Sequence, residues 1–118
     1  MAGSKNTYWA HLRGENAEQK VISYYFKKYP KAKIVGQRLK TPFAEIDILI
    51  QQDFGKMILV EVKTLSSHHF IQNRISKRQK QRLLNAQCYL QEKFESLVEI
   101  HWAYVEKSGE VLVFDEIF

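Results

Sequence analysis

The most apolar stretch of the chain, residues 44–63, is interrupted by four charged residues: Glu45, Asp47, Glu61 and Lys63. Two carboxylates held close together are hard oxygen ligands for Mg²⁺ or Mn²⁺, whose remaining ligands are waters and substrate phosphate oxygens. Such an ion lowers the pKa of a bound water and neutralises charge that develops on a phosphate. A lysine beside it adds a fixed positive charge. A cluster of these residue types would support metal-assisted hydrolysis of a phosphodiester.

A turn at residues 53–55 predicts that this stretch forms a β-hairpin. If Phe54 is the midpoint, opposed residues have numbers that sum to 108, which places Asp47 opposite Glu61 and Glu45 opposite Lys63. Like charges directly across two strands are destabilising, so this register favours a bound cation. The alternative is an ordinary ion pair between Glu45 and Lys63, with Asp47 pointing to water. The other face is predicted to be pure core, with Ile46 opposite Val62, Ile48 opposite Val60, and Ile50 opposite Ile58.

The remaining sequence predicts the elements that must position this hairpin. Helical spacing of apolar residues precedes it and stops at Pro30, and a second helix follows it with Ser76 and Gln79 as a capping box. A second hairpin turns at residues 107–109. The predicted fold is α/β, a mixed β-sheet flanked by helices, in the order αβββαββ: residues 14–29, 33–39, the two hairpin strands, 76–95, 98–106 and 110–117.

Composition limits the class of protein. The chain has 118 residues and 45% hydrophobic content, enough for one domain spanning residues 1–118 with its own core. A single cysteine, Cys88, excludes an internal disulfide framework, and no apolar run approaches the ~20 residues that a membrane span needs. No secretory signal is recognisable, so a cytoplasmic location is expected.

Positive charge is concentrated in the upstream part of the chain. Residues 1–91 hold sixteen of the eighteen Lys and Arg but six of the thirteen Asp and Glu, a net charge of +10, whereas residues 92–118 sum to −5. A basic surface of this kind indicates a polyanionic partner, and nucleic acid is the commonest. The alternative is a solvated basic face. The candidate nucleic-acid-binding residues are Arg74, Lys77, Arg78, Lys80 and Arg82.

Four segments in this order resemble a known family: Gly14-Glu15, then "EIDILI", then "VEVK", then a basic helix containing "RQKQRL". The chain resembles the PD-(D/E)XK nuclease superfamily and its restriction-endonuclease-like core, and more closely the small YraN-type bacterial proteins, whose relatives include archaeal Holliday-junction resolvases. The resemblance implies that Asp47 and Glu61 are metal ligands, with Lys63 as the catalytic lysine. It also implies that Glu15 is a further acid and metal ligand, and that Gln79 or Lys80 supports the site. Glu15 could instead only favour the helix dipole.

The resemblance implies a Mg²⁺- or Mn²⁺-dependent nuclease that acts on DNA, including branched or structured DNA. It also allows a homodimer, because an enzyme that cuts a junction needs two sites. Two alternatives belong to other classes of protein. One is a nucleic-acid-binding protein that keeps this fold without cleaving, and the other is an interaction domain whose basic face meets an acidic protein.

Overall fold

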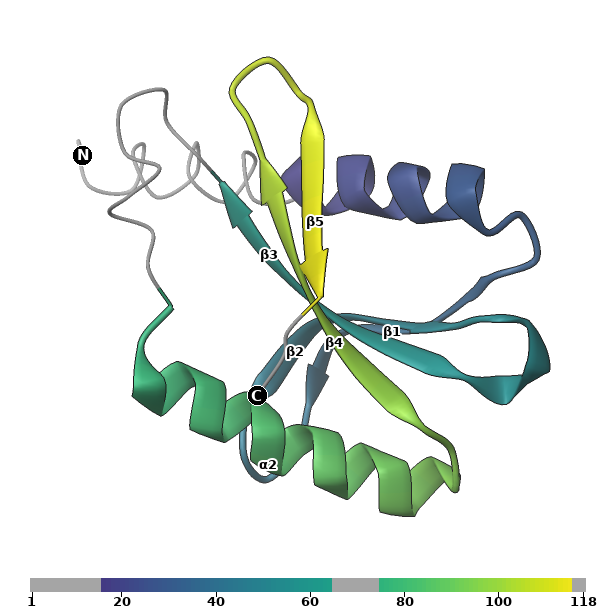
Figure 1. Ribbon diagram of the computed structural model, residues 1–118, viewed down its shortest axis with the longest axis vertical. Helices are drawn as coiled ribbons and strands as arrows, with labels where there is room; N and C mark the ends of the chain where they lie inside the picture. The colour runs from purple at the N-terminus through teal and green to yellow at the C-terminus, as the bar shows by residue number, and fades with distance from the viewer. Residues whose placement is uncertain (1–15, 65–74, 116–118) are drawn as a thin grey trace, which may run out of the picture.

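A computed structural model of the chain describes residues 16–64 and 75–115, which form a five-stranded sheet with a helix on each face (Figure 1). The sheet order follows the chain, β1-β2-β3-β4-β5, and only the β3–β4 pair is parallel. This confirms the predicted α/β class and the order αβββαββ. The strands are β1 (Lys33–Lys40), β2 (Glu45–Gln51), β3 (Met57–Thr64), β4 (Val98–Val105) and β5 (Val111–Asp115).

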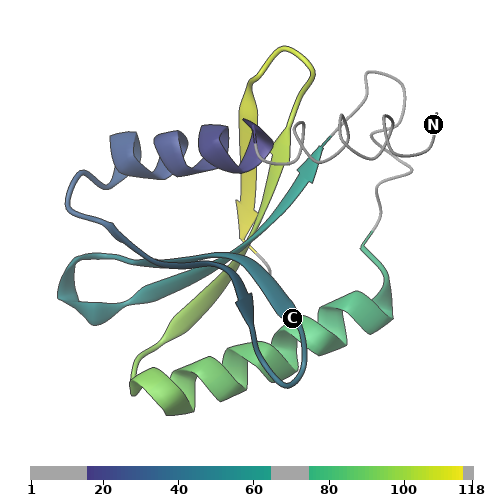
Figure 2. The same ribbon diagram turned by 180° about the vertical axis from the view of Figure 1, so that it is seen from behind.

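The first helix, residues 16–28, covers one face of the sheet (Figure 2). Its buried side chains recur at helical spacing, and it ends before Pro30, whose ring disfavours helical backbone in the preceding residue. They pack against apolar residues of β2, β3 and β4 to form the first core cluster. Its members from the helix and sheet are Ala17, Val21, Ile22, Tyr25, Ile48, Ile50, Ile58, Val60, Ala103 and Val105.

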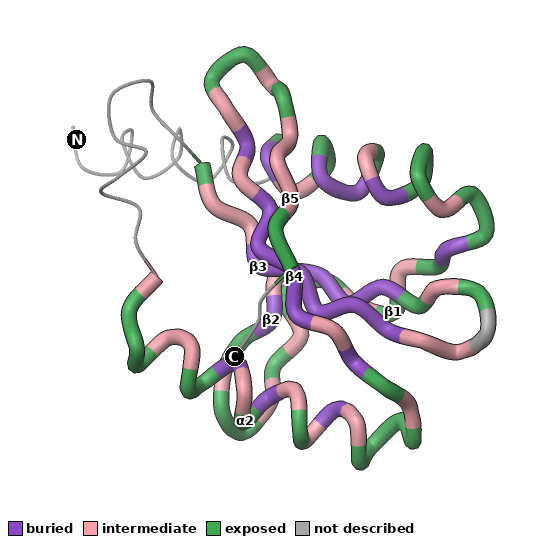
Figure 3. The backbone as a smooth tube through the Cα atoms, viewed as in Figure 1, coloured by how far each residue is buried: buried purple, intermediate pink, exposed green. Residues whose placement is uncertain are grey.

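The second helix, α2 (Lys77–Phe94), covers the opposite face, and the central strands between the two helices are largely buried (Figure 3). Ser76 caps it as predicted, because its Oγ accepts a hydrogen bond from the Gln79 backbone N–H at 3.1 Å. Its C-cap, Glu95, is left-handed with φ 49°. The second core cluster includes Leu83, Ala86, Leu90, Ile46, Leu49, Leu59, Ile100 and Trp102. No helix in the described ranges is long and apolar enough to cross a membrane.

The register of the β2–β3 hairpin is confirmed near its turn, a 3-10 turn at Asp53–Gly55. Ile48 pairs with Val60 and Ile50 with Ile58, both on the first-helix face. The placement predicted for Ile46 is wrong, because Ile46 belongs to the α2-side cluster. Regular alternation is interrupted here for two reasons. Pairing between β2 and β3 ends at Ile48, and on the neighbouring strand Arg38 adopts a left-handed φ of 49°.

Candidate active site

The predicted carboxylates lie where the β2–β3 ladder ends, on the side of the sheet that α2 covers. Beyond the Ile48–Val60 pair, side chains replace the backbone hydrogen bonds of the ladder. The Val62 N–H donates to Asp47 Oδ2 at 2.8 Å, and the Asp47 N–H donates to Glu61 Oε1 at 3.3 Å. Each carboxyl group is therefore fixed by the backbone of the opposite strand, and the two are held beside each other.

Burial and mutual repulsion make this carboxyl pair hard to ionise completely. The Glu61 side chain is 8% exposed, and desolvation, followed by the charge of Asp47, raises the pKa of Glu61 to about 8. Desolvation also raises the pKa of Asp47, against the stabilising hydrogen bond from Val62. Lys63 opposes both shifts. Near neutral pH, Glu61 of the metal-free protein therefore keeps its proton, which a divalent cation would displace.

The chemistry of the donor set fits a hard divalent cation. One oxygen of each carboxyl group is used by the backbone, while Asp47 Oδ1 and Glu61 Oε2 accept no backbone hydrogen bond from the residues of the described ranges. Mg²⁺ is commonly held by two such oxygens together with waters and phosphate oxygens. The part of the chain that the structure describes contains no group of three potential ligands. Asp47 and Glu61 would thus provide two positions and leave the others open.

Lys63 is positioned beside the pair by α2 and β4. Its Nζ donates to Gln79 Oε1 at 3.4 Å and lies 6.0 Å from the centroid of the Trp102 ring. Within the described ranges it forms no ion pair with a carboxylate, and the alternative Glu45–Lys63 pair is not observed. The Lys63 ammonium is therefore held in place by neutral groups, and its charge remains available to a ligand.

Trp102 is a neighbour of the site that the sequence analysis missed. The parallel register places it directly beside Glu61, and its side chain is buried at 2% exposure. Its indole Nε1–H has no hydrogen-bond partner in the described parts of the chain. The strand–helix–strand order was the available signal, because a helical crossover normally joins parallel neighbouring strands.

The predicted basic residues of α2 divide between two sides of the helix. Arg78 and Arg82, one turn apart, share a side, whereas Lys77 and Lys80 point about 100° or more away from them, at 100° per residue. Arg78, Arg82 and Lys77 are exposed, and Lys80 is half-buried. Two further predicted residues, Glu15 and Arg74, lie outside the described residues.

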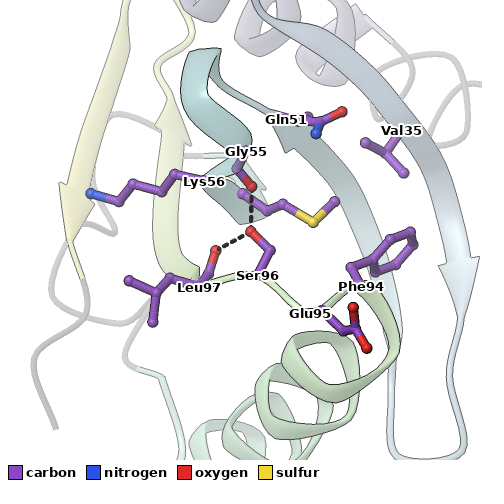
Figure 4. A pocket seen from close by; sticks show the side chains of 9 residues that line it. Val35, Gln51, Gly55, Lys56, Phe94, Glu95, Ser96 and Leu97 are labelled. Carbon is purple, nitrogen blue, oxygen red and sulfur yellow. Dashed lines mark hydrogen bonds between the residues drawn. The ribbon is translucent and has the colours of Figure 1, made fainter.

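A pocket of about 490 Å³ lies at the other end of the β2–β3 hairpin, near its turn (Figure 4). Ser96 bridges its wall by donating to the Gly55 carbonyl. The pocket contains none of the predicted catalytic residues, and only Lys56 and Glu95 are charged among its lining. It therefore offers no chemistry comparable to the carboxyl pair. Its lining residues are Val35, Gln51, Gly55, Lys56, Met57, Phe94, Glu95, Ser96 and Leu97.

A second buried polar cluster lies on the first-helix face. Tyr25 Oη and His101 Nδ1 are 2.6 Å apart, and His101 Nε2 lies 3.1 Å from both Glu99 Oε2 and Asp115 Oδ1. The two carboxylates accept from His101 Nε2, and burial raises the pKa of Tyr25, so its hydroxyl keeps its proton beside Nδ1. The ion pair with Lys56, more than the contact with His101, lowers the pKa of Glu99.

Residues 17–115 match the family model described as "Uncharacterised protein family UPF0102". The chain belongs to the UPF0102 family. Membership covers all five strands and most of the described residues of both helices, including Asp47, Glu61 and Lys63. It confirms the resemblance to YraN-type proteins, and the UPF0102 description names no activity. A search of curated proteins found no match.

Proposed function

We propose that this protein is a metal-dependent nuclease that hydrolyses phosphodiester bonds in DNA. The proposal is carried by the Asp47–Glu61 pair, in which Glu61 is buried and Asp47 half-buried, with Lys63 beside it and free of carboxylate partners in the described ranges. A fold gains no stability from two adjacent carboxyl groups removed from water, whereas a cation site uses such a pair. Perturbed carboxyl groups of this kind are typical of functional sites.

Each residue of the site would have a distinct role. Asp47 and Glu61 would hold the ion through the oxygens that the backbone leaves open. When bound, the ion supplies a water of lowered pKa and neutralises charge on the phosphate. Lys63, held by Gln79, would donate to a phosphate oxygen whose negative charge grows in the transition state. Gln79 is thus a positioning residue, because it acts through the Lys63 ammonium.

Charge distribution supports nucleic acid as the substrate. The chain carries no acidic residue between Glu61 and Glu92, and α2 begins in this segment with exposed Lys77 and Arg78. Cations in a first helical turn oppose the helix dipole, so their placement is better explained by phosphate contacts. The preference for DNA, including branched DNA, and a homodimer with two sites rest on the YraN-type resemblance.

The test is cleavage of labelled duplex, flap and four-way-junction DNA in Mg²⁺, Mn²⁺ or EDTA. Wild type should cut at least one substrate with metal and none in EDTA. Asp47→Asn removes the charge of one ligand while keeping its shape, so cleavage should fall by at least about 10³-fold while DNA binding persists. The matched control is Asp53→Asn, because Asp53 is exposed at the hairpin turn and should be dispensable.

Two results would overturn the nuclease proposal. Cleavage that survives EDTA or Asp47→Asn would place the activity at another site or in a contaminant. Salt-sensitive DNA binding without cleavage of any substrate would instead favour the non-catalytic nucleic-acid-binding protein. An interaction domain that binds an acidic protein is tested by competition. If unrelated DNA displaces such a protein partner, the basic face is a nucleic-acid-binding surface, and the interaction domain is disfavoured.

A further inference from the structure

One side of α2 carries a regular series of cations and an aromatic residue. Arg78, Arg82, Tyr89 and Lys93 are separated by four, seven and four positions, so they fall within an arc of about 60° at 100° per residue. The three cations are exposed and Tyr89 is half-buried. No acidic residue of α2 falls within this arc. We call these four residues the α2 flank.

Phe43 extends the α2 flank from the loop between β1 and β2, which lies against the helix (Figure 1). The Phe43 and Tyr89 rings are edge-to-face with centroids 6.3 Å apart, and Lys93 Nζ lies 5.9 Å from the Tyr89 centroid. Phe43 nevertheless keeps 47% of its surface exposed. Tyr89 therefore supports an aromatic ring whose other side is open to a ligand.

The loop that carries Phe43 is pre-organised. Thr41 Oγ1 donates to the Ala44 carbonyl at 2.7 Å and accepts from the backbone N–H groups of Phe43 and Ala44 at 3.2 and 3.0 Å. A backbone bond from Thr41 N to the Ala44 carbonyl closes the same turn at 3.0 Å. Because the loop is already ordered, a contact through Phe43 costs little conformational entropy.

The chain limits how far this aromatic pair lies from the carboxyl pair. Phe43 lies in the turn before β2, four residues before Asp47, so the two are at most about 13 Å apart along the backbone. Tyr89 follows Gln79, the partner of Lys63, by ten residues, which is about 15 Å along a helix. A stacked strand of nucleic acid advances about 3.4 Å per nucleotide, so either distance corresponds to about four nucleotides.

We infer that the α2 flank and Phe43 bind a single-stranded segment of the nucleic acid next to the carboxyl pair. Arg78, Arg82 and Lys93 contact its phosphates, and an unpaired base stacks on Phe43. Aromatic side chains in a cationic groove are how proteins hold unpaired strands, because every base has a stacking face. Bases inside an intact duplex are already stacked and offer no such face. The inference rests on the proposed function and adds the substrate class.

Binding in EDTA tests the inference without requiring cleavage. Fluorescence anisotropy is measured with a labelled single strand, a blunt duplex and a duplex containing a single-stranded gap. Phe43→Ala should weaken binding to the single strand and the gap by about 5- to 100-fold, with less than about twofold change for the duplex. Phe43→Trp should keep the wild-type affinity. The matched control is Phe26→Ala, on the first helix, where the ring is 40% exposed.

The cations of the α2 flank are tested through the salt dependence. Arg82→Ala should weaken single-strand binding and lower the slope of log affinity against log salt by about 0.7, whereas Lys27→Ala, on the first helix, should leave both unchanged. Unchanged single-strand affinity in Phe43→Ala, or equal losses for single strand and duplex, would overturn the inference alone. A wild-type protein that binds no nucleic acid at low salt would overturn the proposed function as well.

Discussion

Two buried polar clusters lie on opposite faces of the same sheet, and they differ in how completely their charges are satisfied. On the first-helix face, Tyr25 and His101 are joined at 2.6 Å, and His101 has carboxylate partners at 3.1 Å. On the α2 face, burial raises the pKa of both Asp47 and Glu61, and the charge of Asp47 raises that of Glu61 further. In the first cluster the polar groups are partnered with one another, whereas in the second only Lys63 offsets two adjacent carboxyl groups.

The difference separates a structural role from a functional one. Burial of a polar group costs little when its partners are present, so the Tyr25–His101 pair stabilises the packing of the first helix. Two adjacent carboxyl groups that are removed from water beside a single ammonium weaken the fold, and such a pair persists where a ligand uses it. Trp102 lies on the same face as Asp47 and Glu61, and its indole N–H has no hydrogen-bond partner in the described part of the chain.

The largest difference in DNA cleavage rate should be seen when one lysine ammonium is removed beside each cluster in turn. Lys63→Ala should lower single-turnover DNA cleavage in Mg²⁺ by about 10²- to 10³-fold, because the transition state loses a preorganised positive charge. Lys56→Ala removes the ammonium that pairs with Glu99 and should leave the cleavage rate unchanged. Equal losses in both variants would show that the two faces do not have separate roles.

The pH dependence of stability should distinguish the Asp47–Glu61 pair from the Tyr25–His101 cluster. Folded Glu61 holds its proton more tightly than unfolded Glu61, so the free energy of unfolding of the metal-free protein should fall as pH rises from 4.5 to about 8. Glu61→Gln cannot ionise and keeps an acceptor for the Asp47 N–H. It should flatten this fall and be more stable than wild type at pH 8 by a few kcal/mol. Denaturant unfolding at several pH values measures the unfolding free energy of both proteins. If wild type and Glu61→Gln show the same pH dependence, the prediction is wrong.

In the Tyr25–His101 cluster, removal of a polar group should lower the stability of the protein, whereas Glu61→Gln raises it. Tyr25→Phe removes the hydroxyl that lies 2.6 Å from His101 Nδ1 and leaves this buried ring nitrogen without a hydrogen-bond partner from Tyr25. The variant should lose about 1–3 kcal/mol of unfolding free energy while cleavage stays at the wild-type rate. Chemical denaturation and the cleavage assay together test this. Tyr24→Phe is the control, because Tyr24 is only half-buried.

A divalent metal ion should stabilise the protein through the face that carries Asp47 and Glu61, and not through the Tyr25–His101 cluster. Mn²⁺ should raise the Tm of wild type by a few degrees, more at pH 8 than at pH 6, because the ion replaces the proton on Glu61. Asp47→Asn should abolish the shift, and Tyr25→Phe should keep it. A shift that persists in Asp47→Asn would indicate binding elsewhere, and calorimetric titration would then give the number of sites.

Local rules were sufficient for the elements and for half of the hairpin. The turn at residues 53–55 fixes the pairing of Ile48 with Val60, and Ser76 fixes the start of α2 through a hydrogen bond within one turn. The same rules failed for Ile46, because alternation assumes a regular strand. At Asp47 a side chain replaces the ladder bond, and neighbouring Arg38 is left-handed.

The surroundings of the carboxyl pair depend on contacts between distant segments. The spacing of Lys63 from Glu61 places them on one face, but the position of Trp102 follows from parallel pairing across a helical crossover. Helical periodicity predicts that Arg78 and Arg82 lie on the same side of α2. It does not reveal that the loop carrying Phe43 packs against Tyr89 on that side. Both features require knowledge of which elements are neighbours.

The parallel β3–β4 pairing also has a consequence for the folding pathway. The β2–β3 hairpin closes a short turn and can form within microseconds, whereas β4 must join β3 across residues 65–97, which is slower. We therefore expect Asp47 and Glu61 to meet while water still screens them. Their repulsion becomes costly only when α2 and Trp102 arrive. Neutralising the pair should mainly lower the barrier for this last docking event and so accelerate refolding.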